Sequence, residues 1–111
     1  MAKKSSINID ILLDDQNVPD KISWSSSDGS KEVEESKAML LSLFDKENLE
    51  TVKIDLWTKE MQVVEMDRFF YQTLRALADT YFKATQNTQL ASEMRHFVQH
   101  FGETTDVLPK A

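Results

Sequence analysis

Two histidines form the one pair of residues in this chain whose spacing suggests metal chemistry. The chain has 111 residues, and its two histidines, His96 and His100, lie four residues apart in a segment that we expect to be helical. Both rings would then point to one side of the helix, as zinc ligands must. Glu93 and Glu103 lie nearby, but a working zinc site also needs further ligands and a supporting shell. The apolar residues of this segment occupy the other side, so we expect two solvated histidines and no functional metal site.

The sequence offers no other catalytic constellation. It contains no cysteine, which excludes thiolate nucleophiles, disulfides and cysteine-based metal sites. Its two glycines, Gly29 and Gly102, stand alone, so no glycine-rich phosphate loop is present. The clustered carboxylates, such as Asp14 and Glu34, fall in segments that we expect to be solvated, where general acid–base chemistry is not favoured. We therefore expect no catalytic residues, no cofactor and no enzymatic activity.

The charge distribution limits the classes of partner that the chain is expected to bind. The net charge is −6, and the 13 basic residues are dispersed, with Lys3 and Lys4 as the one adjacent pair. Binding to nucleic acid or to anionic membranes needs clustered Lys and Arg. No apolar run reaches the roughly 18 residues that a membrane span requires, and no signal peptide is recognisable. We expect a cytoplasmic protein that binds neither nucleic acid nor membranes.

The first half of the chain reads as β-structure. Apolar and polar residues alternate with a period of two in several short runs rich in β-branched residues, which is typical of strands. The acidic segment 32–37 fits either a helical turn or a strand, and the loop 25–31 is rich in Ser with one Gly. The expected strands lie near residues 6–13, 20–25, 37–45 and 50–57.

The second half changes to a helical period. Apolar residues recur every three or four positions, which predicts amphipathic helices near 62–85 and 88–101. Asn87 or Thr88 can cap the second helix, and Gly102 is a natural helix end. The tail 103–111 is expected to be loose. Strands followed by helices predict a single α+β domain over residues 1–111, with a four-stranded antiparallel sheet and two helices packed on one face.

The sheet is expected to keep an apolar face away from the helices. Trp57 has the opposite parity to Val52, Ile54 and Leu56, and the third strand is apolar on both faces. An exposed apolar sheet face is typical of a subunit or protein-binding surface. The alternative is a central strand with an imperfect outer face. The residues that we expect to bind protein are Leu12, Leu40, Phe44 and Trp57, and we expect the chain to form a homo-oligomer.

Three segments carry a resemblance to a known family. They are Ile22-Ser23-Trp24-Ser25 followed by Asp28-Gly29, the run from Ile54 to Met61, and Phe70 to Leu74 continuing to Ala78-Asp79-Thr80. In these segments, and over almost the whole chain, the sequence resembles the gliding-motility-associated GldC proteins. The resemblance implies a small soluble factor, not an enzyme, that is associated with surface gliding and its linked secretion system.

The order of four strands and two helices also resembles the export chaperone SecB at the level of the fold. SecB-like proteins are acidic oligomers that bind unfolded chains along apolar grooves, so this resemblance implies a chaperone-like activity. A likeness of folds does not fix function, and no SecB binding residue can be placed on this sequence. The alternative is a structural adaptor or homo-oligomeric subunit with one fixed partner and no chaperone activity.

Overall fold

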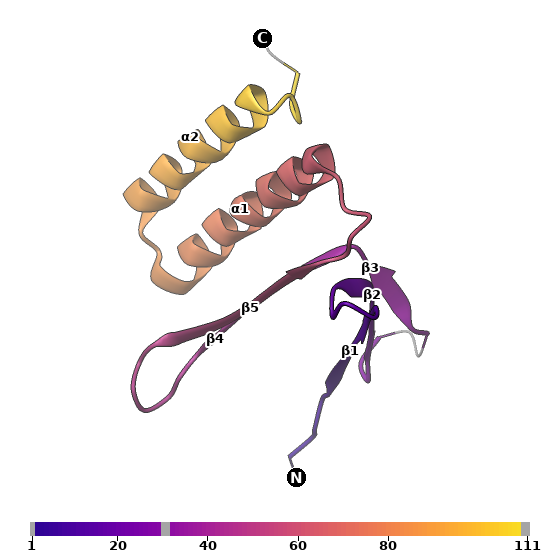
Figure 1. Ribbon diagram of the computed structural model, residues 1–111. Coiled ribbons are helices and arrows are strands. Elements are labelled where there is room, and N and C mark those ends of the chain that lie inside the picture. The colour runs from indigo at the N-terminus through magenta and orange to yellow at the C-terminus, as the bar shows by residue number, and fades with distance from the viewer. Residues whose placement is uncertain (1, 30–31, 110–111) are drawn as a thin grey trace. The chain divides into compact units, whose positions relative to one another are not determined.

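The structure is a computed structural model that describes residues 2–29 and 32–109. It confirms the α+β class, with five strands followed by two helices (Figure 1). The chain divides into two compact units, residues 1–61 and 62–111. Whether the helices pack on one face of the sheet stays a prediction.

The first unit holds two antiparallel sheets. β1 (Ile7–Leu13), β2 (Pro19–Ser26) and β3 (Glu34–Ser36) form one sheet in the order β1-β2-β3. β4 (Ala38–Phe44) and β5 (Thr51–Trp57) form a second, two-stranded sheet. The prediction of one four-stranded sheet was therefore wrong, although the four expected strands match β1, β2, β4 and β5 to within one residue at each end.

The reason for the split is that the chain changes its pairing partner just before the expected third strand. The short strand β3, which precedes that strand, pairs with β2, with Ile22 opposite Ser36. After Lys37 the chain continues as β4, which pairs instead with β5, with Ala38 opposite Trp57. Strands that bend from one sheet into another are a known way to turn a corner. The segment 32–37, which fitted helix or strand, thus contains a short strand, while Ser30 and Lys31 of the expected loop lie outside the described residues.

Backbone hydrogen bonds tie the two sheets together just after β5. The Thr58 N–H donates to the Lys37 carbonyl at 2.8 Å, and the Lys59 N–H donates to the Pro19 carbonyl at 3.1 Å. Ile22, at the centre of the β1-β2-β3 sheet, is 1% exposed and Thr58 is 2% exposed. The most buried side chains of this unit therefore lie near the point where the sheets meet.

The second unit is a helical hairpin of α1 (Val63–Thr85) and α2 (Thr88–Thr104) (Figure 1). Of the two residues predicted as caps, Asn87 caps α2, its side chain accepting the Leu90 N–H at 3.0 Å. Gln86 ends α1 in the left-handed conformation, with its N–H on the Phe82 carbonyl. The most buried residues of the two helices are small or β-branched, which lets the helices approach closely. They are Ala78, Ala91, Val98 and Gly102.

Gly102 does not end the second helix, contrary to the prediction, because α2 continues to Thr104. A Cβ at Gly102 would lie 2.7 Å from Tyr71 Cε1 of α1 and 2.7 Å from Leu108 Cδ1. The chain turns back after Asp106, which has a φ of 62°, and the Leu108 N–H donates to the Gly102 carbonyl at 2.9 Å. The part of the tail up to Leu108 is thus packed on α2 where a loose tail was expected, and Lys110 and Ala111 lie outside the described residues.

Candidate protein-binding surface

The register of the β4–β5 hairpin sorts its side chains onto two faces of different character. Residues that stand opposite each other in an antiparallel pair project to the same face. One face consists of three apolar pairs: Met39–Leu56, Leu41–Ile54 and Leu43–Val52. The other face mixes apolar and polar pairs: Ala38–Trp57, Leu40–Asp55, Ser42–Lys53 and Phe44–Thr51. Trp57 thus lies on the face opposite Val52, Ile54 and Leu56, in agreement with the predicted parity.

Three of the four residues expected to bind protein share this mixed face. Leu40 and Trp57 are diagonal neighbours, because Ala38 stands opposite Trp57 and Asp55 stands opposite Leu40. Phe44 lies at the far end of the hairpin, and Leu12 belongs to β1, where it stands opposite Lys21 in the other sheet. Trp57 is 56% exposed, Phe44 68% and Leu12 59%, while Leu40 is half-buried. The structure therefore places Leu40 next to Trp57, whereas Phe44 and Leu12 lie away from these two residues.

A shallow hollow adjoins Trp57. Its volume is about 270 Å³, and it is lined by Trp57, Leu56 and Asp55 of β5 together with Val18 and Pro19 at the start of β2. Its walls are mainly apolar, and Asp55 is ion-paired with Lys53 at 3.4 Å. A hollow beside an exposed indole offers a place for an apolar side chain of a partner. We call Trp57, Leu40, Val18 and Pro19 the Trp57 surface.

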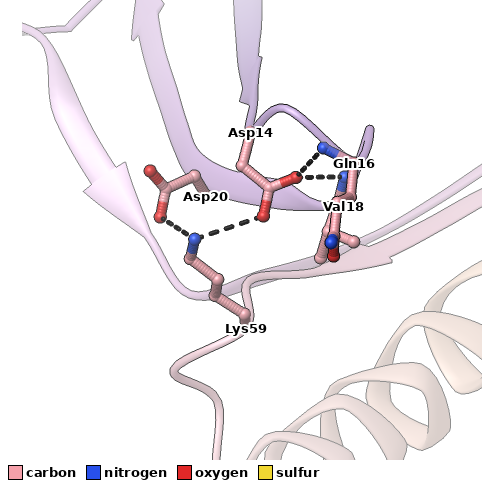
Figure 2. A network of polar contacts seen from close by, with 5 residues as sticks. All are labelled: Asp14, Gln16, Val18, Asp20 and Lys59. Atoms are coloured by element: carbon pink, nitrogen blue, oxygen red, sulfur yellow. Dashed lines mark hydrogen bonds and ion pairs between the residues drawn. The ribbon is translucent and has the colours of Figure 1, made fainter.

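A polar network fixes the chain immediately after Trp57 (Figure 2). Lys59 Nζ lies 3.2 Å from Asp14 Oδ2 and 3.5 Å from Asp20 Oδ1. The other oxygen of the Asp14 carboxylate accepts the backbone N–H groups of Gln16 at 2.8 Å and Val18 at 3.0 Å. One carboxylate thus links the β1–β2 turn to Lys59, two residues after the end of β5. Because Val18 belongs to both the network and the hollow, the network connects directly to the Trp57 surface.

The same contacts shift the pKa values of the two central groups. The pKa of Asp14 lies below its ordinary value because the Val18 and Gln16 N–H groups, and then Lys59, stabilise the carboxylate. The pKa of Lys59 lies above its ordinary value, owing to its hydrogen bond with Asp14 and the charge of Asp20. Both groups are therefore charged at neutral pH, and the network is complete there.

A second, more polar cavity lies where the two sheets meet. It has a volume of about 230 Å³, and the buried Thr58 lines it together with Ser36 and Lys37. The Thr58 hydroxyl oxygen is buried and has no hydrogen-bond partner among the residues that the structure describes. Such a hydroxyl carries a cost unless water reaches it, and the cavity is large enough to hold water. Its remaining lining residues are Asp20, Lys21, Ile22, Glu35 and Glu60.

The structure adds nothing to the case for a metal site. His96 and His100 are exposed on α2, and the ring of His100 lies 6.3 Å from that of Phe97. Within residues 2–29 and 32–109, no group of three His, Cys, Asp or Glu side chains is placed to hold a metal ion. In the same part of the chain, neither helix combines the length and apolar character that crossing a bilayer requires.

Sequence reasoning missed two features of this region. The Asp14–Lys59 network joins residues 45 positions apart, and no local pattern reveals such a contact. Leu49, in the turn between β4 and β5, has a φ of 59° and is 64% exposed. A bulky residue in the left-handed region is uncommon, and a positive φ at Leu49 cannot be read from its neighbours. Leu49 adds an exposed apolar side chain to the turn between β4 and β5.

Comparison with known proteins gives one match. No curated protein and no solved structure is significantly similar to this chain, so the expected likeness to SecB has no structural neighbour to support it. The model of the family described as gliding motility-associated protein GldC-like matches residues 19–107. The matched range contains β2 to β5 and both helices, and so includes Trp57 and Lys59. Because the match covers well over half of the sequence, the chain belongs to the GldC-like family of gliding motility-associated proteins.

Proposed function

We propose that this chain is a non-enzymatic protein-binding factor that supports bacterial gliding and its associated secretion system. Membership of a gliding motility-associated family supports the context. The observation that carries the binding role is Trp57, which is 56% exposed on a strand whose end is held by the Lys59 network. Exposed aromatic side chains on a rigid element supply much of the binding energy at protein interfaces.

The chaperone-like form of this proposal assigns the apolar residues of β4 and β5 to unfolded segments of client proteins. An extended apolar segment needs a long apolar surface, and the hairpin offers apolar side chains on both faces. The net charge of −6 would keep such a surface soluble by mutual repulsion of the copies.

The alternative is an adaptor or homo-oligomeric subunit with one fixed partner and no chaperone activity. The preorganised Trp57 surface favours this second form, because a surface that is rigid before binding pays little ordering entropy and suits one defined partner. The hollow beside Trp57 would then receive a single side chain of that partner.

The experiment that tests the proposal is capture from the cytoplasm of a gliding bacterium, with mass-spectrometric identification. The wild-type chain is expected to retain components of the gliding or secretion machinery, and Trp57→Ser is expected to retain much less of them. Lys46→Ser, which changes an exposed polar residue in the β4–β5 turn away from the hollow, is the control and should behave as wild type. Equal capture by the wild type and Trp57→Ser would exclude the Trp57 surface as the binding site.

A second assay separates the two forms of the proposal. A chaperone should suppress the aggregation of several unrelated unfolded proteins at stoichiometric amounts. An adaptor should leave all of them to aggregate while still retaining its one partner.

A further inference from the structure

The hydrogen-bond pattern of the β4–β5 hairpin shows which backbone groups point away from it. The pair Asp45–Glu50 closes one end with an N–H···O bond of 2.8 Å, and Lys37–Thr58 closes the other end at 2.8 Å. Bonded and non-bonded pairs alternate along an antiparallel ladder. The backbone groups of Ser42 and Lys53 are therefore not bonded to each other, although Lys53 Nζ donates to Ser42 Oγ at 3.1 Å. The same backbone pattern holds for Leu40–Asp55 and Phe44–Thr51. The N–H and C=O groups of Leu40, Ser42 and Phe44 point outward from β4.

Within the described residues, β5 is the one strand that pairs with β4, so the outer edge of β4 is unpaired. Proteins protect such edges with charged side chains, because an unpaired edge is a template for another strand. The other strands with a free edge carry charges: Asp10 on β1, Glu34 and Glu35 on β3, and Lys53 and Asp55 on β5. β4 reads Ala-Met-Leu-Leu-Ser-Leu-Phe and carries none.

We propose that β4 pairs antiparallel with β4 of a second copy of this chain, around a two-fold axis at Ser42. This inference rests on the proposed function, because Leu40 and Phe44 are among the residues expected to bind protein. It adds that the partner at the β4 edge is a second copy of the chain. The absence of charge on β4 favours a second copy as the occupant, because it avoids the repulsion that the other edges would bring. Each copy carries a net charge of −6, and β4 is the free edge at which two copies can meet without bringing charged strand residues together.

The two-fold arrangement is self-complementary. With Ser42 opposite Ser42 of the second copy, Leu40 stands opposite Phe44 of the second copy on the mixed face. On the apolar face, Leu41 stands opposite Leu43 of the second copy. Cross-strand pairs of apolar and aromatic side chains stabilise antiparallel sheets. The two hairpins together form one four-stranded sheet, and the apolar face of each hairpin continues into the other.

The absence of cysteine makes a crosslinking test clean, because a single introduced thiol has no other partner. Cα atoms of a hydrogen-bonded antiparallel pair lie about 5.5 Å apart, within the range that a disulfide spans. Ser42→Cys is therefore expected to form a disulfide-linked dimer under mild oxidation. Lys53→Cys, directly across the hairpin on the β5 edge, is the matched control and should stay largely monomeric, because β5 lies one strand away from the interface.

Proline substitutions test the backbone pairing itself. Ser42→Pro removes an N–H that bonds to nothing inside the hairpin, so the hairpin can still form while the added strand loses a donor at its centre. Sedimentation of the wild type at tens of micromolar should show a dimer, and Ser42→Pro should raise its dissociation constant at least tenfold. Lys53→Pro, the equivalent change on the β5 edge, should leave the dimer intact, and far-UV circular dichroism verifies that each variant folds.

Several outcomes would overturn this inference. They are a wild type that stays monomeric, equal crosslinking of the two cysteine variants, or a dimer that survives in a folded Ser42→Pro. Loss of the dimer in Ile9→Pro but not in Ser42→Pro would move the interface to the β1 edge. If Ser42→Pro does not fold, the comparison of Ser42→Cys with Lys53→Cys tests the pairing without it. A monomeric wild type that still captures partners through Trp57 would refute the self-pairing and leave the proposed function standing.

Discussion

Asp14 and Lys59 show how a few side chains hold the Trp57 surface in place. The Asp14 carboxylate accepts two backbone N–H groups with one oxygen and contacts Lys59 with the other. Lys59 is two residues beyond Trp57, and its backbone N–H also bonds to Pro19. Removing the charge of Asp14 therefore affects both the stability of the first unit and the geometry of the hollow beside Trp57.

Asp14→Asn is predicted to lower the free energy of unfolding at neutral pH, with a loss that fades in acid. The folded pKa of Asp14 is depressed, so its contribution is fully present above the unfolded pKa of about 3.9. That contribution disappears as the pH falls through the lower, folded value. Urea unfolding of wild type and variant at pH 7 and pH 3 tests this, with the exposed neighbour Asp15→Asn as control. An equal difference at both pH values would show that the Asp14 charge is not responsible.

The backbone conformation of Leu49 leads to a second prediction, which concerns stability. Its φ of 59° places a branched side chain in the left-handed region, which costs roughly 1–2 kcal/mol for an L-residue. Asn tolerates this conformation better. Leu49→Asn should therefore stabilise the protein by about 0.5–1 kcal/mol. Urea unfolding measures the effect, and Val52→Asn, at an exposed site in extended backbone, should give no gain. A loss of stability in Leu49→Asn would mean that the leucine side chain has a packing role.

At the scale of elements, the packing of α2 depends on the absence of a side chain at Gly102. Alanine there gains helix propensity of about 1 kcal/mol, but its Cβ would lie 2.7 Å from atoms of Tyr71 and Leu108. Overpacking typically costs about 1–3 kcal/mol. Gly102→Ala should therefore destabilise the protein by about 1 kcal/mol in thermal or urea unfolding.

The double variant Gly102→Ala with Leu108→Ala provides the control for the glycine prediction. Removing the Leu108 side chain opens space for the new methyl group, so the further cost of Gly102→Ala should be smaller in that background. A cost that is the same in both backgrounds would show that the contact with Leu108 is not the cause.

The elements also show which parts of the fold could be predicted from the sequence. Strand and helix positions were predictable because periods of two and of 3.6 residues are local properties. The bend at Lys37 was not, since the change of pairing partner from β2 to β5 depends on strands that are distant in the sequence. Gly102 was misread as a helix end because its true neighbours, Tyr71 and Leu108, are revealed only by the folded structure.

The candidate site was predictable to a similar extent. The side of the sheet on which Trp57 lies follows from period-two parity, and the register agrees with it. The grouping of Leu12, Leu40, Phe44 and Trp57 depended on a single four-stranded sheet, and the split into two sheets separates Leu12 from the others. The hollow formed with Val18 and Pro19, and the Lys59 network behind it, depend on tertiary contacts that no local pattern encodes.

At the scale of the whole molecule, we propose that Trp57 serves binding and not folding. Its exposure of 56% contrasts with 1% for Ile22 in the same unit. Truncating a core Ile to Ala typically costs about 2–5 kcal/mol of stability, whereas truncating an interface Trp often costs 2 kcal/mol or more of binding. The Ile22→Ala variant therefore serves as the folding reference for Trp57→Ser.

The most direct test is a pair of measurements on Trp57→Ser, namely urea unfolding and retention of a partner or of self-association. Unfolding is followed at several protein concentrations, because loss of a dimer lowers the apparent stability at a fixed concentration. We predict that Trp57→Ser keeps its concentration-independent stability to within about 1 kcal/mol of the wild type and loses most of its binding, while Ile22→Ala shows the larger loss of stability. If Trp57→Ser instead loses several kcal/mol at every concentration and still associates normally, Trp57 is a core residue and the proposed binding surface is wrong.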